Sequence, residues 1–196
     1  DHERLKRVCD EWGVPVRSVH APTVDVFDEE AFFEMLGIVR DVYEVDNVTL
    51  HPGRDNPIQA FEFFDKKGDR VDEIGVDLMY ENFDDNAPNE RWLPRAKNII
   101  TAPPEQVALT YDTSHVGLRT NVLRELRKAN EEDRLGMVHL SDRTNDEKHL
   151  PVYEGAHDME SIVEFLKARS VFVCLEYIER EERLIADYHE LAEEIE

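Results

Sequence analysis

The stretch VALTYDTSH at residues 107–115 decides the fold of this chain. It is a short apolar run that ends in Asp112, and His115 follows three positions later. Apolar runs without strict alternation are typical of strands in a parallel sheet that helices cover. Five further runs also end in a histidine or a carboxylate, at residues 14–20, 48–51, 76–81, 137–139 and 171–176.

The spacing of these runs predicts the architecture. Their last residues are 31, 30, 31, 27 and 37 positions apart. A strand with its return helix takes about 30 residues. The chain is therefore predicted to be α/β, a (β/α)8 TIM barrel forming one domain over residues 1–196. In such a barrel the carboxyl ends of the strands carry the active site.

The elements between the runs read as helices. We expect helices over 2–12, 29–43, 59–67, 119–131, 159–168 and 179–195, with Asp28 and Asp158 as N-terminal caps and Gly68-Asp69 ending the third. A short, irregular strand is possible at 151–153. Because the chain opens on a helix, the first barrel strand is expected to be missing from it, and an open barrel would need a partner to cover its edges.

The net charge limits the kinds of partner that the protein can bind. The 196 residues carry 45 acidic against 23 basic side chains, a formal net charge of −22. Such a surface repels nucleic acid and anionic membranes at low salt. It is also typical of a salt-loving host, where molar salt screens the repulsion. No apolar run reaches the length of a membrane helix, and only two cysteines favour a cytoplasmic protein without disulfides.

The strand-end residues predict a metal or acid/base site. They are His20, His51, Glu81, Asp112 with His115, His139 and Glu176, while Glu147 and His149 lie in the charged loop 141–149. Each taken alone has a plainer interpretation, such as a packed histidine, a helix cap or a solvated loop. Together, without thiolates, they suit Mn²⁺, Mg²⁺, Co²⁺, Fe²⁺ or catalytic Zn²⁺.

The local motifs resemble those of the xylose isomerase-like barrel superfamily. They are His-Ala-Pro at 20–22, His-Pro-Gly at 51–53, Glu-Asn at 81–82, Asp-Thr-Ser-His at 112–115, His-Leu-Ser-Asp at 139–142 and Lys-His-Leu-Pro at 148–151, with Glu176. The superfamily includes sugar-phosphate isomerases and epimerases, and the endonuclease IV type of abasic-site DNA-repair enzyme.

In the isomerase and epimerase branch, the resemblance implies one divalent ion, manganese or zinc with magnesium or cobalt as alternatives. Its ligands would be Glu81, Asp112, His139 and Glu176. Glu81 and Glu176 would also be the acid/base pair on the two faces of a keto-sugar, and His115 would contact the substrate.

In the endonuclease IV branch, the resemblance implies three zinc ions shared by nine ligands: His20, His51, Glu81, Asp112, His115, His139, Glu147, His149 and Glu176. Glu147 departs from the pattern, since that family has Asp there. Asp142 is expected to support the site from the loop.

Three features favour the first branch. The loop after His20 lacks the tyrosine of the DNA-repair branch, the chain is short for that branch, and the loops at the predicted barrel mouth hold many acids. Arg54, Arg91 and Arg143 are the phosphate candidates. We therefore expect a sugar or sugar-phosphate isomerase or epimerase, with a nucleic-acid substrate only under the alternative and oligomers possible.

Overall fold

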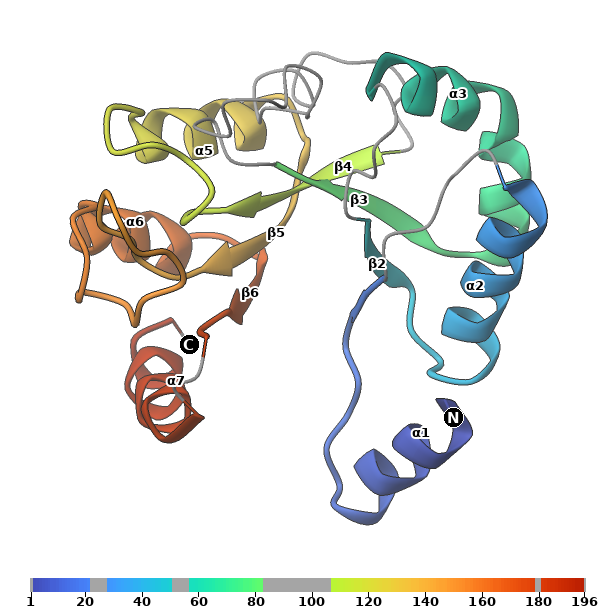
Figure 1. Cartoon of the computed structure of the whole chain (residues 1–196), viewed down its shortest axis with the longest axis horizontal. Coiled ribbons are helices and arrows are strands. Elements are labelled where there is room, and N and C mark those ends of the chain that lie inside the picture. The colour runs from blue at the N-terminus through green and yellow to red at the C-terminus, as the bar shows by residue number, and fades with distance from the viewer. Residues whose placement is uncertain (1, 22–27, 51–56, 83–106, 179–180, 196) are drawn as a thin grey trace. The chain divides into compact units, whose positions relative to one another are not determined.

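The structure, a computed structural model, describes residues 2–21, 28–50, 57–82, 107–178 and 181–195 (Figure 1). Helices and strands alternate along it. In chain order they are α1 (His2–Glu11), β1 (Val19–His20), α2 (Glu29–Asp41), β2 (Asn47–Leu50), α3 (Pro57–Ile74), β3 (Asp77–Glu81), β4 (Val107–Asp112), α5 (Val122–Glu131), β5 (Leu135–Leu140), α6 (Met159–Lys167), β6 (Phe172–Leu175) and α7 (Glu181–Ile195).

The chain divides into two compact units, and each is described by itself. One comprises Asp1–Glu81 with Thr101–Ala108, and the other comprises Asn82–Ile100 with Leu109–Glu196. No helix among the described residues is long and apolar enough to span a membrane.

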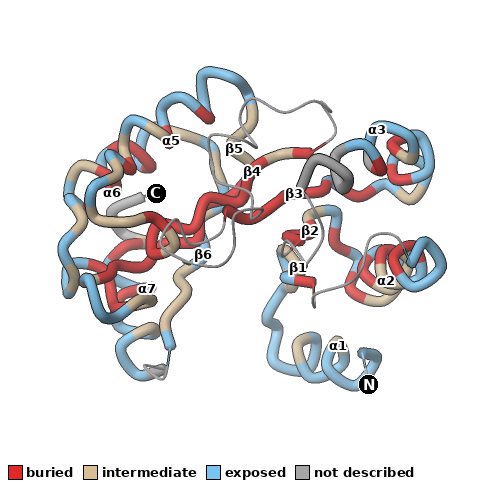
Figure 2. Tube along the Cα trace, turned by 45° about the horizontal axis from the view of Figure 1, so that its top comes forward, coloured by how far each residue is buried: buried red, intermediate tan, exposed pale blue. Residues whose placement is uncertain are grey.

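The first unit holds a parallel sheet of β1, β2 and β3. Val48 of β2 lies opposite Val19 on one side and Leu78 on the other. The apolar face of α2 is buried through Phe32 and Phe33, and the Phe32 ring packs edge-on against Phe63 of α3 at 5.6 Å. The sheet and the inner helix faces therefore form one core, visible as buried segments in Figure 2.

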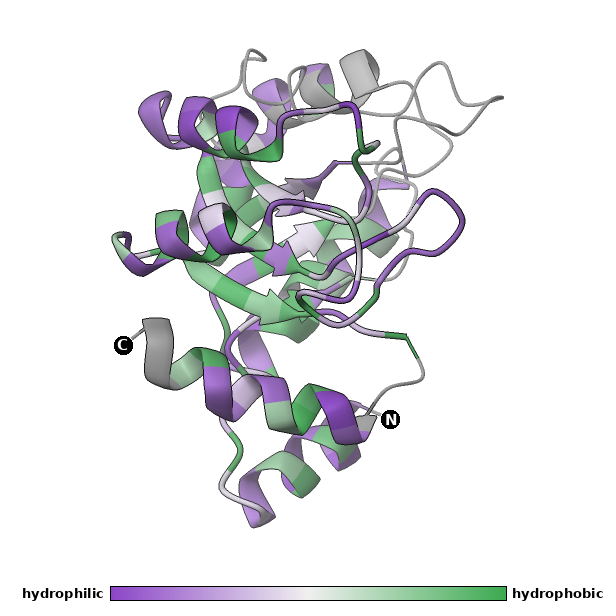
Figure 3. Ribbon diagram, turned by 90° about the vertical axis from the view of Figure 1, so that its left-hand side faces the viewer, coloured by the Kyte–Doolittle hydropathy of each residue, from purple (hydrophilic) through white to green (hydrophobic). Residues whose placement is uncertain are grey.

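The second unit repeats this arrangement with β4, β5 and β6. These strands are also parallel, and His139 of β5 lies opposite Asp112 on one side and Cys174 on the other. Helix α5 packs on α6, and α6 on α7. Figure 3 shows hydrophobic residues along much of the strands, while the helices alternate hydrophilic and hydrophobic residues along their length. The predicted α/β alternation with parallel strands is confirmed.

Two predicted boundaries are wrong for reasons of backbone chemistry. The strand predicted at 14–20 is a strand at Val19–His20 alone, because Pro15 lacks a donor for a ladder and Val14 is exposed. Helix α3 does not stop at Gly68. It runs to Ile74 and ends at Gly75, which has φ +76° and donates its N–H to the carbonyls of Val71 and Asp72.

The short strand considered at 151–153 does not form. Tyr153, the last residue of this segment, has φ of +72°, and His149, two residues before the segment, has φ of +53°, so the chain is not extended here. Instead, Leu150 makes an isolated antiparallel bridge to Asp142. The described residues thus contain six strands, two fewer than a closed eight-stranded barrel.

Packing of α5 provides a test of this core. Leu126 is fully buried, so Leu126→Ala is expected to lower the free energy of unfolding by about 2–5 kcal/mol, measured by urea denaturation. Leu5 of α1 is 55% exposed, and Leu5→Ala should cost less than about 0.5 kcal/mol. Equal losses at both positions would contradict the described packing.

Candidate metal centre

Asp112, the last residue of β4, is the most constrained side chain of the predicted site. It is 0% exposed, and its Oδ1 accepts the backbone N–H groups of Ser114 at 2.7 Å and His115 at 3.3 Å. The side-chain amide of Asn82 holds the Asp112 backbone, accepting its N–H at 2.8 Å and donating to its carbonyl at 3.0 Å. These bonds leave Oδ2 as the oxygen that faces other side chains.

His115 presents its second ring nitrogen to that oxygen. Its Nδ1 lies 2.9 Å from the carbonyl oxygen of Asn82, which can only accept, so Nδ1 carries a proton. Its Nε2 lies 3.3 Å from Asp112 Oδ2. In the neutral ring Nε2 carries a lone pair that faces the Asp112 carboxylate. A cation bound between the two would stabilise this pair of electron-rich atoms.

His149 comes to the same carboxylate from the loop after β5. Its Nδ1 lies 3.9 Å from Asp112 Oδ2 and 3.3 Å from Ser114 Oγ, and its ring stands edge-on to that of His115 at 5.2 Å. The backbone of His149 is left-handed, which costs a non-glycine residue of order 1–3 kcal/mol. Asp112, His115 and His149 together could hold a metal ion.

The ends of β5 and β6 supply a second donor group. His139 is buried, and its Nδ1 lies 2.8 Å from Oε2 of Glu176, the residue directly after β6. One donor atom each of Asp112, His139 and Glu176 lies within 4.8 Å of the others. This group could hold a single divalent cation. Asp112 belongs to both groups.

In the first unit, the predicted residues His20 and Glu81 meet. His20 Nε2 lies 2.9 Å from Glu81 Oε2, and Glu81 is 1% exposed. A buried carboxylate at a strand end needs such a partner, since an uncompensated charge away from water is costly. The structure places both at the carboxyl ends of their strands, as the sequence predicts.

Other predicted residues are placed differently. Glu147 is exposed in a turn in which its N–H donates to Thr144 Oγ1, and it is not among the grouped donors of the described residues. His51, Arg54 and Arg91 lie outside the described residues.

Arg143 is built into the scaffold. It is 4% exposed, and its guanidinium donates to the backbone carbonyls of Thr144, Ser114 and Val116. These bonds tie the loop after β5 to the loop after β4. This favours a structural role for Arg143 over a phosphate contact.

Asp142 holds the same loop from inside. Its carboxylate accepts the backbone N–H groups of Arg143, Gly155 and His157 at 2.8, 2.9 and 3.1 Å. A Cβ on Gly155 would lie 2.5 Å from the Arg143 backbone, so this approach requires glycine. The expected supporting role of Asp142 matches this geometry.

Two residues without a predicted role hold the site together. One is Asn82, which bonds both to the backbone of Asp112 and to the ring of His115. The other is Thr113, which is 0% exposed and whose hydroxyl lies 3.2 Å from the carbonyl oxygen of His139 and 2.5 Å from that of Ser141. A signal was present, since both lie inside the quoted motifs Glu-Asn and Asp-Thr-Ser-His.

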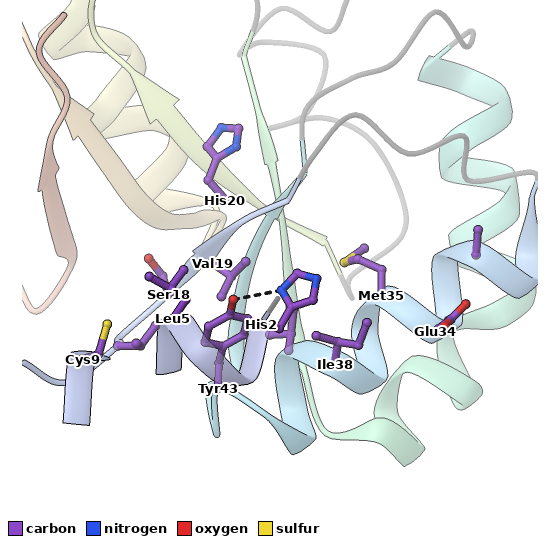
Figure 4. Close-up of a pocket in the computed structure, with 13 residues that line it drawn as sticks. His2, Leu5, Cys9, Ser18, Val19, His20, Glu34, Met35, Ile38 and Tyr43 are labelled. Carbon is purple, nitrogen blue, oxygen red and sulfur yellow. Dashed lines mark hydrogen bonds between the residues drawn. The ribbon is translucent and has the colours of Figure 1, made fainter. Parts of the chain in front are cut away.

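A mostly apolar cavity of about 610 Å³ lies in the first unit, among α1, β1 and α2, and His20 is one of its lining residues. Figure 4 shows the rings of His2 and Tyr43 joined there by a 2.9 Å hydrogen bond, with the His20 ring standing apart from them. Its lining is mostly aliphatic, including Leu5, Met35 and Ile38. Its polar lining residues, which are the minority, are His2, Ser18, His20, Glu34 and Tyr43.

The comparisons with known proteins agree with this geometry. The family model described as "Xylose isomerase-like TIM barrel" matches residues 3–195. The chain belongs to this family. The carboxylates and histidines at its strand ends therefore sit on the scaffold that the motifs indicate. Among curated proteins, none matches the chain.

Solved structures of the same fold include two epimerases and a dehydratase. The 3-keto-D-glucoside 4-epimerase YcjR from E. coli has a TM-score of 0.66 and 16% identity, over 99% of this chain and 83% of that one. The structure of D-psicose 3-epimerase in the presence of D-fructose has a TM-score of 0.65 and 15% identity, over 90% of this chain and 69% of that one. The probable 3-DHS dehydratase AsbF from Bacillus anthracis has a TM-score of 0.70 and 12% identity, over 97% of this chain and 81% of that one. At these identities the likeness establishes the fold.

His157 makes the stability of the folded protein depend on pH. Burial lowers the pKa of its imidazole below the ordinary 6.5, and the nearby Arg143 adds to this while Asp142 opposes it. The folded protein thus binds this proton more weakly than the unfolded chain. Stability is lost as the pH falls through about 6.5, where the unfolded histidine takes up its proton.

His157→Asn is therefore expected to flatten the decline in stability between about pH 7.5 and 5.5. The variant keeps the backbone N–H that Asp142 accepts. Urea denaturation of metal-free protein at several pH values measures this, with exposed His189→Asn as the matched control. A His157→Asn profile parallel to that of the wild type would contradict the assignment.

Proposed function

We propose that this protein is a divalent-metal-dependent isomerase or epimerase that acts on a sugar or sugar phosphate by proton transfer. The observation that carries the proposal is the donor group of Asp112, His139 and Glu176 at the ends of three consecutive parallel strands. Two carboxylates and an imidazole without a thiolate suit Mn²⁺, Mg²⁺, Co²⁺ or catalytic Zn²⁺.

The proposed ligand set is completed by Glu81 on the basis of its motif. When bound, the ion would polarise the substrate carbonyl and acidify the neighbouring C–H group. One of Glu81 and Glu176 would then remove the proton as general base, and the other would return a proton as general acid. His115 is fixed by Asn82 and would orient a substrate hydroxyl.

The proposed substrate class follows from the family and from the phosphate candidates. Two of the structures with this fold are named as epimerases of keto-sugars or keto-glucosides, which supports a carbohydrate ketone here. Because the Arg143 guanidinium is engaged with backbone carbonyls, a substrate phosphate would depend on Arg54 and Arg91.

The first experiment combines metal content with proton exchange. Protein purified in high salt without chelator is analysed for metal, and is then incubated with ketoses and ketose phosphates in D₂O. We expect about one ion per chain and deuterium at the carbon next to the carbonyl, read by NMR. A metal-loaded protein that exchanges no carbon-bound proton in the whole panel would reject the proposal.

Glu176→Gln tests the acid/base role. The amide cannot accept a proton, so turnover should fall by at least about 10²-fold, the usual contribution of a general base. Exposed Glu190 on α7 supplies the control Glu190→Gln, which should retain wild-type turnover. The proposed mechanism fails if the Glu176→Gln protein keeps near-normal activity.

One observation favours a second candidate, an abasic-site endonuclease of the endonuclease IV type. Asp112, His115 and His149 form a further donor group that shares Asp112 with the first. A carboxylate has two oxygens and can serve two ions, and multinuclear sites are suited to phosphodiester hydrolysis. The exposed position of Glu147 argues against the complete nine-ligand set.

His149→Asn separates the two candidates, because asparagine tolerates the left-handed backbone at this position. Under the favoured proposal both proteins should hold about one ion per chain by elemental analysis. If instead the wild type holds about three zinc ions and the variant loses one, together with cleavage of an abasic duplex in molar salt, the hydrolase is the correct function.

A further inference from the structure

The short segment after β6 is bonded to the loop that carries His149. The N–H of Ile178 donates to the carbonyl of His149 at 3.4 Å. The N–H of Val152, a residue that is 1% exposed, donates to the hydroxyl of Tyr177 at 3.1 Å. Two consecutive residues following Glu176 therefore fix the loop on both sides of Leu150.

The Tyr177 hydroxyl also donates its proton, and this second hydrogen bond fixes the orientation of the O–H group. Its proton goes to Oδ2 of Asp187 on α7 at 2.8 Å, and Asp187 is 3% exposed. The other oxygen of Asp187 pairs with Nε of Arg183 at 2.7 Å. A hydroxyl that accepts a buried N–H and donates to a buried carboxylate has no substitute in phenylalanine.

The loop needs this restraint because His149 has an unfavourable backbone. Left-handed non-glycine residues persist where the surroundings over-determine them. Both restraints act on residues that directly follow His149. Asp142 bridges to Leu150, and the hydroxyl of Tyr177 accepts the N–H of Val152.

We propose that Tyr177 is a positioning residue for the metal centre, and that its hydroxyl sets the loop so that the His149 imidazole stands beside Asp112. The inference rests on the proposed function, because it takes Asp112, which the His149 imidazole stands beside, to be a metal ligand. Asp187 and Arg183 act through it by keeping the hydroxyl turned toward α7. The segment after β6 thereby links Glu176 with the donor group around His149.

The experiment compares Tyr177→Phe with Tyr43→Phe in the full chain, both in molar KCl. Tyr43 is a matched control, since its hydroxyl also bonds a side chain, that of His2, in the other unit. The first measurement uses metal-free protein and follows the His149 ring signals by NMR, assigned with His149→Asn. The second titrates Co²⁺ alone and follows its absorption spectrum.

Tyr177→Phe should shift the His149 ring signals and weaken Co²⁺ binding by about tenfold, the usual effect of losing an outer support of a metal ligand. Tyr43→Phe should change neither. Asp187→Asn keeps an oxygen for the Tyr177 proton and is expected to retain wild-type signals, whereas Asp187→Ala should move them as Tyr177→Phe does. The Asp187 pair serves as the test if Tyr177→Phe does not fold.

Unchanged His149 signals in Tyr177→Phe, with Co²⁺ affinity within twofold of the wild type, would overturn the inference. Altered signals in a protein whose wild type takes up no Co²⁺ would reject the proposed function alone, since the positioning of His149 is then measured without metal. A loss of thermal stability with unchanged ring signals would mean that Tyr177 only joins α7 to the core, and would also overturn the inference.

Discussion

The buried carboxylate of Asp112 is the constraint around which the second unit is arranged. A charge that is 0% exposed must be compensated by hydrogen bonds or cations. Backbone N–H groups of Ser114 and His115 supply part of this, and they shape the turn after β4. Asn82 fixes the backbone of Asp112 and the ring of His115 together. Asn82 thus aligns two donor residues before any ion is bound, Asp112 through its side-chain amide and His115 through its backbone carbonyl.

The neighbouring strands extend this arrangement because they are parallel and in register. Since His139 lies opposite Asp112, the two side chains emerge at the same edge of the sheet. Glu176 follows β6 at that edge and meets His139 at 2.8 Å. The His139 imidazole and the Glu176 carboxylate can each bind either a proton or a metal ion. Metal binding at this edge must therefore compete with protonation and weaken at low pH.

The sequence predicts residues whose environment follows from their place in a repeat. Glu81 and Asp112 end their strands as expected, and Asp28 and Asp158 cap their helices by accepting the N–H groups of Ala31 and Ser161. It does not predict which glycine ends α3, because Gly68 and Gly75 have the same propensity, whereas the burial of Val71 beyond Gly68 is a tertiary contact. The role of Arg143 is hidden for a similar reason, since its acceptors are backbone carbonyls that leave no trace in sequence.

The environment of loop residues is likewise hard to predict from sequence. The loop after β5 also shows how a loop can hold a metal-binding side chain in place. Glu147 and His149 stand two positions apart in one charged segment, yet Glu147 is exposed while His149 reaches Asp112. The difference comes from long-range bonds. Asp142 gathers three N–H groups, and the absent side chain of Gly155 lets the backbone close over Arg143. A loop held in this way gives His149 a fixed position at the cost of a left-handed backbone, so rigidity here comes from buried polar contacts rather than from a strand or a helix.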